Sequence, residues 1–157
     1  MITATPPVLS NFERTRRWLA ACGKLPSDPN LSTQIGCHIE EFTEFIDVVN
    51  IESATGATSV ATQEVSNILK AIAINLKRGH ATARIYDREA ALDALSDSEV
   101  TGNGIAYLAG FDKPAADRRV LDANDNKLNA DGTAVILDGG KIGKRQGWQA
   151  ADLADLV

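Results

Sequence analysis

One short segment constrains the fold of this chain more than any other: residues 37–45, CHIEEFTEF. On an α-helix its three glutamates, Glu40, Glu41 and Glu44, fall within an arc of roughly 100°. The opposite side of the same helix carries a broad apolar row. That row consists of Ile35, Ile39, Phe42, Phe45, Ile46 and Val49. The pattern predicts an amphipathic helix with one acidic stripe and one apolar stripe.

An acidic stripe of this kind has two interpretations. It can be a solvated surface, which is the commoner role of glutamate taken alone. It can also bind a hard divalent cation, because like charges three or four residues apart repel unless a cation lies among them. A second ladder, Glu89, Asp93 and Asp97, favours the cation. Aspartate is a poor residue for a helix interior, so two of them there need a reason.

Composition narrows the class of protein. The formal net charge of −5 argues against a sequence-independent binder of nucleic acid polymers, which usually carries a basic surface. No apolar run approaches the length of a membrane span, and the first residues lack the pattern of a signal peptide. We therefore expect no membrane partner and a cytoplasmic location. Cys22 and Cys37 do not form a disulfide framework.

Helix periodicity and capping residues predict an all-α fold of four to five helices in a single domain, residues 1–157. Residues 1–9 are expected to be an extended arm, and residues 55–61 a loop. Residues 127–157 are expected to be a C-terminal arm that is irregular or a short β-hairpin, with one helical turn within 150–157. The expected helices are 10–21, Asn30 or Ser32 to about Ser53, 65–78, 87–110, and 113 to 123 or 126.

Several residues have more than one possible role. Gly102 and Gly104 either permit packing of another backbone or allow a ligand to approach. Lys141, in a tail that fails the spacing of a phosphate-binding loop, could close over a nucleotide or belong to a solvated basic surface. His38 could contact a substrate or simply bond to Glu41. The basic row of the first expected helix, Arg14, Arg16 and Arg17, is interpreted as a solvated face, with Trp18 in the core.

Three segments together resemble the MazG-like, all-α nucleoside triphosphate pyrophosphohydrolases, in particular the phage branch. Residues 40–45, EEFTEF, look like the family's Glu-Glu-x-x-Glu motif. Residues 92–97 followed by 104–112 are similar to its second acidic helix. Residues 123–128, ANDNKL, with the Asp131-Gly132 turn, resemble its Asn-x-x-Lys segment and glycine-rich tail.

The resemblance implies hydrolysis of a (deoxy)nucleoside triphosphate to monophosphate and pyrophosphate with Mg²⁺ or Mn²⁺. It implies a homodimer or homotetramer that associates through its helices, in the host cytoplasm if the chain is phage-encoded. Glu41, Glu44 and Asp97 fall on metal-ligand positions, and Glu40 on the acid that positions or deprotonates water. The family has Glu where this chain has Ala94, so Asp93 takes that place.

Asn124 and Lys127 match positions expected near the substrate phosphates. With His38 and Lys141 they form the predicted substrate-binding set. The substrate expected from the phage branch is a purine deoxynucleotide such as dGTP or dATP. Two alternatives stay open: a non-catalytic helical interaction module, and a hydrolase of another nucleotide-like pyrophosphate.

Overall fold

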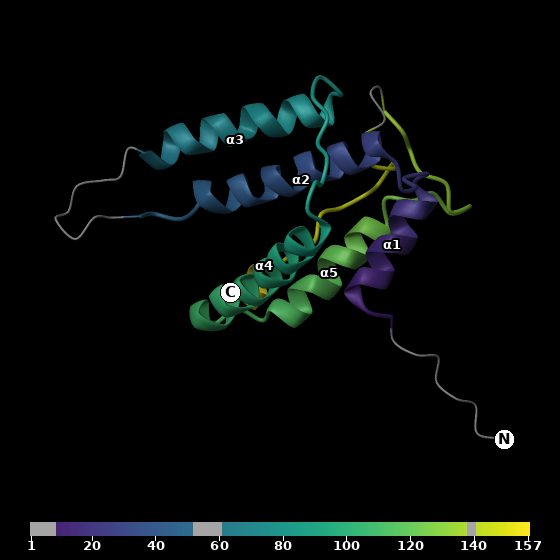
Figure 1. Ribbon diagram of the computed structural model, residues 1–157. Coiled ribbons are helices and arrows are strands. Elements are labelled where there is room, and N and C mark those ends of the chain that lie inside the picture. The colour runs from purple at the N-terminus through teal and green to yellow at the C-terminus, as the bar shows by residue number, and fades with distance from the viewer. Residues whose placement is uncertain (1–8, 52–60, 138–140) are drawn as a thin grey trace. The chain divides into compact units, whose positions relative to one another are not determined.

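The computed structural model describes residues 9–51, 61–137 and 141–157 (Figure 1). These residues form α1 (Asn11–Ala21), α2 (Asp28–Asp47), α3 (Ala61–Lys77), α4 (Arg88–Ala109), α5 (Lys113–Asp125) and a 3₁₀ turn, η2 (Ala154–Leu156). Within these ranges β-pairing is limited to two isolated antiparallel bridges, Leu128–Ala134 and Ile136–Ile142. The predicted all-α fold with an irregular C-terminal arm is confirmed.

The chain divides into two compact units. Pro26–Tyr86, with α2 and α3, forms one unit, and the remainder, with α1, α4, α5 and η2, forms the other. None of the described helices combines the length and the hydropathy that crossing a membrane requires. The single domain expected from the sequence stays a prediction.

Most helix ends follow the capping residues. The side chains of Ser10, Asp87 and Asp112 accept hydrogen bonds from backbone N–H groups in the first turns of α1, α4 and α5, at 3.2, 3.0 and 3.0 Å. These bonds satisfy donors that have no partner inside the helix. Gly79 and Gly110 follow α3 and α4 with φ of 72° and 80°, a left-handed conformation in which glycine has no steric penalty.

The boundaries of α2 differ from the prediction. Ser27, and not Asn30 or Ser32, caps the helix by accepting from the Asn30 N–H at 3.4 Å. The helix therefore begins before Asn30 and includes Pro29 in its first turn, where a residue needs no N–H donor. Helix α2 ends at Asp47 and not near Ser53. Ser53 itself lies outside the described residues. Of the predicted loop at residues 55–61, residues 55–60 lie outside the described residues too, and Ala61 is not loop but the first residue of α3, which begins four residues before the expected start at residue 65.

Helices α2 and α3 pack antiparallel, largely through small and hydroxyl-bearing side chains (Figure 1). The buried residues described on these two helices are Ser32, Gly36, Thr43, Ser66, Ala73 and the larger Leu76. The hydroxyls are satisfied locally: Thr43 donates to the Ile39 carbonyl at 2.6 Å and Ser66 to the Asp47 carboxylate at 2.6 Å. The two backbones approach closely at Gly36, which has no side chain, opposite the small Ala73.

Two ion pairs flank this contact. Asp47, at the end of α2, pairs with Lys70 at 2.6 Å, and Glu40, two turns earlier, pairs with Lys77. The hydroxyl of Ser32 also accepts from the Ala83 N–H at 3.0 Å, which fixes the segment after α3 against the start of α2. Polar contacts therefore set the register of the two helices.

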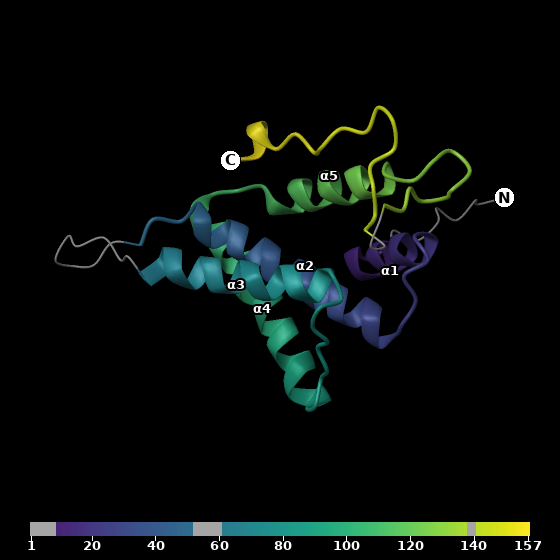
Figure 2. The ribbon, with the colours of Figure 1, turned by 90° about the horizontal axis from the view of Figure 1, so that it is seen from above.

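Helix α5 organises the other unit, where it contacts α1, α4 and η2. Arg14 of α1 reaches Asp122 at 2.7 Å and Asp125 at 2.6 Å. Arg119 of α5 donates to the Asp152 carbonyl at 2.7 Å and to the Asp155 carboxylate. Figure 2 shows the C-terminal segment running back beside α5 towards its first turn. The arm therefore belongs to the folded unit.

We expect Gly36→Ala to destabilise the α2–α3 pair. A Cβ at this position would lie 2.9 Å from the Ala73 carbonyl oxygen and 3.1 Å from Leu76 Cβ. Overpacking costs about 1–3 kcal/mol and the gain in helix propensity is about 1 kcal/mol, so the free energy of unfolding should fall by up to about 2 kcal/mol. Urea unfolding measures the change.

The matched control is Gly102→Ala, where a Cβ meets nothing within 4 Å. Since nothing packs there, this variant should be more stable by up to about 1 kcal/mol. Equal changes at Gly36 and Gly102 would contradict the close contact of α2 and α3.

The Asp47 carboxylate predicts a pH dependence of stability. Hydrogen bonds from Lys70 and then Ser66 hold the pKa of Asp47 below its ordinary value. A lowered folded-state pKa stabilises the protein above the unfolded-state pKa, and that contribution is lost as the pH falls through the folded-state value. Asp47→Asn should therefore be less stable at pH 7, with the difference shrinking as the pH falls below about 4 and vanishing only below the lowered pKa of the folded state.

Thermal unfolding across this pH range tests the effect. Lys70→Met should lose the same contribution, and the double variant should lose no more than either single variant. Additive losses would show that Asp47 and Lys70 act separately.

Candidate functional site

The acidic stripe of α2 is divided between two environments. Glu40 is half-buried and ion-paired with Lys77 of α3. Glu41 and Glu44 are exposed, and Glu44 makes no ion pair with any described residue. His38 is exposed on the same helix. One glutamate of the motif therefore holds α2 to α3, while Glu44 keeps its charge uncompensated.

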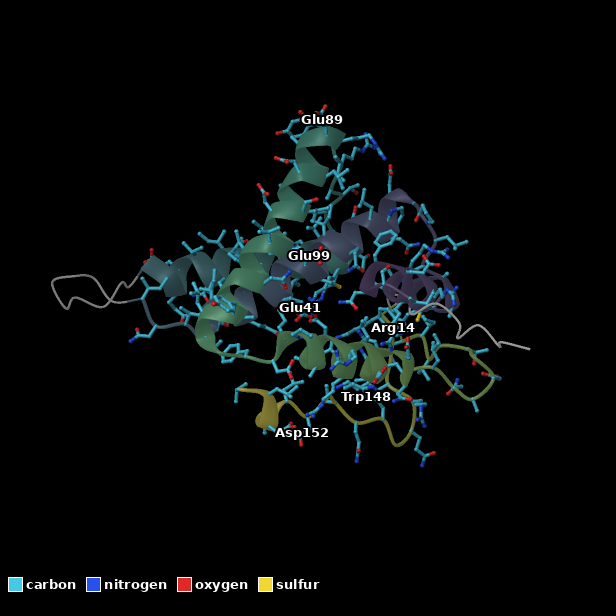
Figure 3. All side chains as sticks on the ribbon, turned by 90° about the horizontal axis from the view of Figure 1, so that it is seen from below. Arg14, Glu41, Glu89, Glu99, Trp148 and Asp152 are labelled. Carbon is cyan, nitrogen blue, oxygen red and sulfur yellow. The ribbon has the colours of Figure 1, made fainter. Side chains whose placement is uncertain are left out.

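The acidic ladder of α4 is exposed along its length. Asp93 and Asp97 make no ion pair within the described ranges, and Figure 3 shows Glu89 at the N-terminal tip of the helix. An open cavity of about 370 Å³ is lined by Asp87, Glu89, Ala90 and Asp93. Three carboxylates thus border one hollow, although the Asp87 side chain also caps the helix.

The donor chemistry of both rows fits a hard divalent cation, since each row presents carboxylate oxygens. Mg²⁺ keeps several waters and is usually bound through one or two carboxylates together with substrate phosphates, so neither row has to supply a complete coordination sphere. Among the residues that the structure describes, no three His, Cys, Asp or Glu side chains form a group that could hold a metal. Glu41 and Glu44 lie in one compact unit and Asp93 and Asp97 in the other. Their joint role as ligands stays a prediction.

A second cluster lies at the C-terminal end of α5. The Lys127 ammonium lies 5.4 Å from the Trp18 ring centre and 5.6 Å from that of Trp148. Lys127 also donates to the Asn124 side-chain oxygen at 2.8 Å. The structure therefore brings together Asn124 and Lys127, two of the predicted substrate-binding residues, and places both beside aromatic rings. Lys144 lies 4.2 Å from the Trp148 ring centre.

The end of α5 positions this cluster. Trp148 Nε1 donates to the Ala123 carbonyl at 2.7 Å, and Arg145 Nε donates to the Asn126 carbonyl at 2.7 Å. The last carbonyls of a helix lack partners inside it and carry partial negative charge, so donors and cations are favoured there. Figure 3 shows Trp148 against α5.

A buried indole nitrogen and an open cavity lie near the cluster. The Trp18 Nε1 atom is buried and has no hydrogen-bond partner among the described residues. A cavity of about 410 Å³ opens at the same end of α5. Its lining consists of Asp125, Asn126, Leu128, Asn129, Ala130, Gly132 and Arg145. The sequence neighbours of Lys127 on both sides therefore border a hollow with one acidic and one basic side chain.

Sequence reasoning missed the grouping of Trp18, Lys127 and Trp148. The two tryptophans are 130 positions apart, and nothing in their local pattern relates them. A usable signal was the proximity in sequence of Trp148 to Lys144 and Arg145. Lys141, the predicted basic residue of this tail, is exposed, and it is Lys144 that lies over the ring.

The basic residues of α1 are engaged within their own unit. Asp125 and Asp122 raise the pKa of Arg14. A side-chain hydrogen bond from Arg16, with a further one from Arg17, lowers the pKa of Glu13 to about 2. These pairings favour a structural and solvated role for the basic row over a phosphate-binding one.

No protein-family model matches the chain, and the searches of curated proteins and of solved structures found no significant match. The resemblance to the MazG-like enzymes therefore stays a prediction from the three sequence segments.

We expect Trp148→Ala to release the C-terminal arm from α5. The change removes the ring beside Lys127 and Lys144 and the hydrogen bond to Ala123. For a half-buried tryptophan the loss should be about 2–3 kcal/mol, below that of a fully buried one. Urea unfolding measures the stability, and trypsin should cut faster after Lys144.

Trp148→Phe serves as the control. It keeps an aromatic face for the ammonium groups and loses the indole donor, so the cost should be about 1 kcal/mol. Unchanged cleavage in Trp148→Ala would contradict the attachment of the arm through this ring.

Proposed function

We propose that the chain hydrolyses a (deoxy)nucleoside triphosphate to the monophosphate and pyrophosphate, with Mg²⁺ or Mn²⁺ as cofactor. The supporting observation is that exposed carboxylates on α2 and α4, at Glu44, Asp93 and Asp97, have no ion-pair partner within the described ranges. A protein of net charge −5 needs cations to hold a polyphosphate, and uncompensated carboxylates attract divalent ions.

In this proposal Glu41, Glu44, Asp93 and Asp97 hold the metal. A bound divalent ion supplies Lewis-acid chemistry by lowering the pKa of water and offsetting charge on the phosphates. Glu40 orients or deprotonates the attacking water. Its ion pair with Lys77 limits the positions that its carboxylate adopts.

The cluster at the end of α5 is the proposed contact with the nucleotide. Lys127 would contact the leaving phosphates as a point charge, with Asn124 as its neighbour. Aromatic rings stack on any base, so Trp18 and Trp148 support a nucleotide as ligand without selecting one. The preference for dGTP or dATP rests on the resemblance, as does a homodimer or homotetramer, whereas a cytoplasmic location is the expectation from the sequence pattern. His38 and Lys141 remain proposed substrate contacts.

A non-catalytic interaction module is the second candidate. It is favoured by the absence of a ready metal-ligand group among the described residues and by the large exposed side chains of α4, such as Leu92, Val100 and Leu108. Exposed apolar surface of this extent indicates a protein–protein contact. Hydrolysis of another nucleotide-like pyrophosphate differs from the first proposal only in the base.

The decisive experiment measures pyrophosphate release from a panel of triphosphates with Mg²⁺ or Mn²⁺. Glu44→Gln and Asp97→Asn should each lose at least about 100-fold in kcat/KM, because even residues that only support a ligand cost 10–100-fold. Glu99→Gln, an exposed acid of α4 outside the ladder, should retain the rate. Full activity in Glu44→Gln, or no turnover of any triphosphate, would refute the proposal.

A thermal-shift comparison with EDTA, Mn²⁺ and Mn²⁺ plus nucleotide separates the two candidates. A ligand that binds the folded state at a hundred times its Kd stabilises it by about 2.7 kcal/mol. The hydrolase predicts a shift that needs metal and nucleotide together, whereas the interaction module predicts none.

A further inference from the structure

Lysines of α3 compensate two of the three acids along one edge of α2. Glu40, Glu44 and Asp47 lie at i, i+4 and i+7, so at about 100° per residue they share one side of the helix. Lys77 pairs with Glu40, and Lys70 pairs with Asp47 at 2.6 Å. Glu44, between the two pairs, is exposed and makes no ion pair within the described ranges. Of these three carboxylates, that of Glu44 therefore remains uncompensated.

The Lys77 side chain is fixed along its length. Only 20% of it is exposed. A Cβ at Gly36 would lie 2.9 Å from Lys77 Cγ, so the lysine stem packs on α2 at the point where that helix has no side chain. The ammonium group then donates to Oε1 of Glu40, one turn further along α2. A lysine packed and paired in this way is ordered before any ligand binds, and it therefore fixes the position of the Glu40 carboxylate.

Without its lysine, Glu40 would reach the same cation as Glu44. Side chains four residues apart on a helix are neighbours, with Cβ atoms about 5–6 Å apart. Carboxylate oxygens are the ligands that suit Mg²⁺ and Mn²⁺, so a cation on Glu44 attracts an uncompensated carboxylate beside it. Asp47 differs, because Ser66 donates to its Oδ1 at 2.6 Å while Lys70 donates to its Oδ2. Loss of the lysine would leave Asp47 bonded to a serine, but would leave Glu40 without a partner among the described residues.

We propose that Lys77 is a positioning residue that holds Glu40 off the divalent cation, so that α2 supplies its metal ligands from Glu41 and Glu44. One oxygen of Glu40 is bonded to the ammonium group, and the other makes no hydrogen bond to any described residue. That second oxygen is the one that orients or deprotonates water.

A carboxylate drawn onto the metal would lose this role, because a base must lie within hydrogen-bond reach of the proton that it removes. The inference rests on the proposed hydrolysis. It deepens that proposal by separating the residue that acts on water from the residues that bind the metal.

Replacement of Lys77 should have two effects of opposite sign. Lys77→Met removes the ammonium group and keeps an unbranched stem beside Gly36. Mn²⁺ alone, titrated into the full chain and followed by the electron paramagnetic resonance of the free ion, should bind at least about tenfold more tightly, because a further carboxylate joins the site. The kcat for pyrophosphate release should fall at least about tenfold, because Glu40 leaves its position beside the water. A purely structural defect would weaken both.

Lys70→Met is the matched control. It removes the same charge from the same helix, and the acid that it frees on α2 remains bonded to Ser66. Its Mn²⁺ affinity and its kcat should change little. Because both variants lose one positive charge, the difference between them is not a general effect of net charge.

Removal of the whole ion pair is a second test. Glu40→Gln combined with Lys77→Met removes one charge of each sign. Mn²⁺ should then bind as tightly as it does to the wild type, because neither residue is a ligand, while kcat should be no higher than in Lys77→Met alone. Glu44→Gln should instead weaken Mn²⁺ binding, since it removes a ligand.

Equal Mn²⁺ affinities in Lys77→Met and Lys70→Met would overturn the inference. So would a gain in affinity that persists when Glu40→Gln is added, or a wild-type kcat in Lys77→Met. In each of these cases a wild type that still hydrolyses a triphosphate leaves the proposed function standing. No hydrolysis by any of these proteins, the wild type included, would refute the proposed function and this inference together.

Discussion

The close contact between α2 and α3 is the constraint on which the unit of residues 26–86 depends. The position of Gly36 leaves no room for a side chain between the helices. The buried hydroxyls of Thr43 and Ser66 find hydrogen-bond acceptors on α2 without forcing the two helices apart. Dispersion forces act over short distances, so backbones that approach closely gain contacts despite small side chains. The ion pairs of Glu40 and Asp47 with lysines of α3 then set the register.

Because of this contact, some charged and apolar side chains of α2 pair with α3 and others remain exposed. Glu40 neutralises Lys77, whereas Glu44 on the adjacent face keeps its charge without an ion-pair partner within the described part of the chain. Residues such as Phe42, which a more conventional helix pair would bury, are left for another surface. Acidic and apolar side chains are thus exposed together on the described part of α2.

The other unit is held by polar contacts along α5. Arg119, midway along the helix, binds the C-terminal segment, and Trp148 and Arg145 donate to carbonyls at the end of the helix. The rings of Trp18 and Trp148 offer Lys127 a favourable electrostatic surface, because the face of an aromatic ring attracts cations. The arm supplies one of these rings, so its folding completes the cluster.

By itself the amino-acid sequence determined the helices and most of their ends, because caps such as Ser10, Asp87 and Gly110 act on their own helix within a few residues. Only the tertiary structure decided that Glu40 pairs with Lys77, that Pro29 opens α2, and that Trp18 and Trp148 flank one lysine. Periodicity shows which side of a helix is apolar, but not which neighbour covers it. That choice depends on how closely two backbones approach, and here Gly36 decided it.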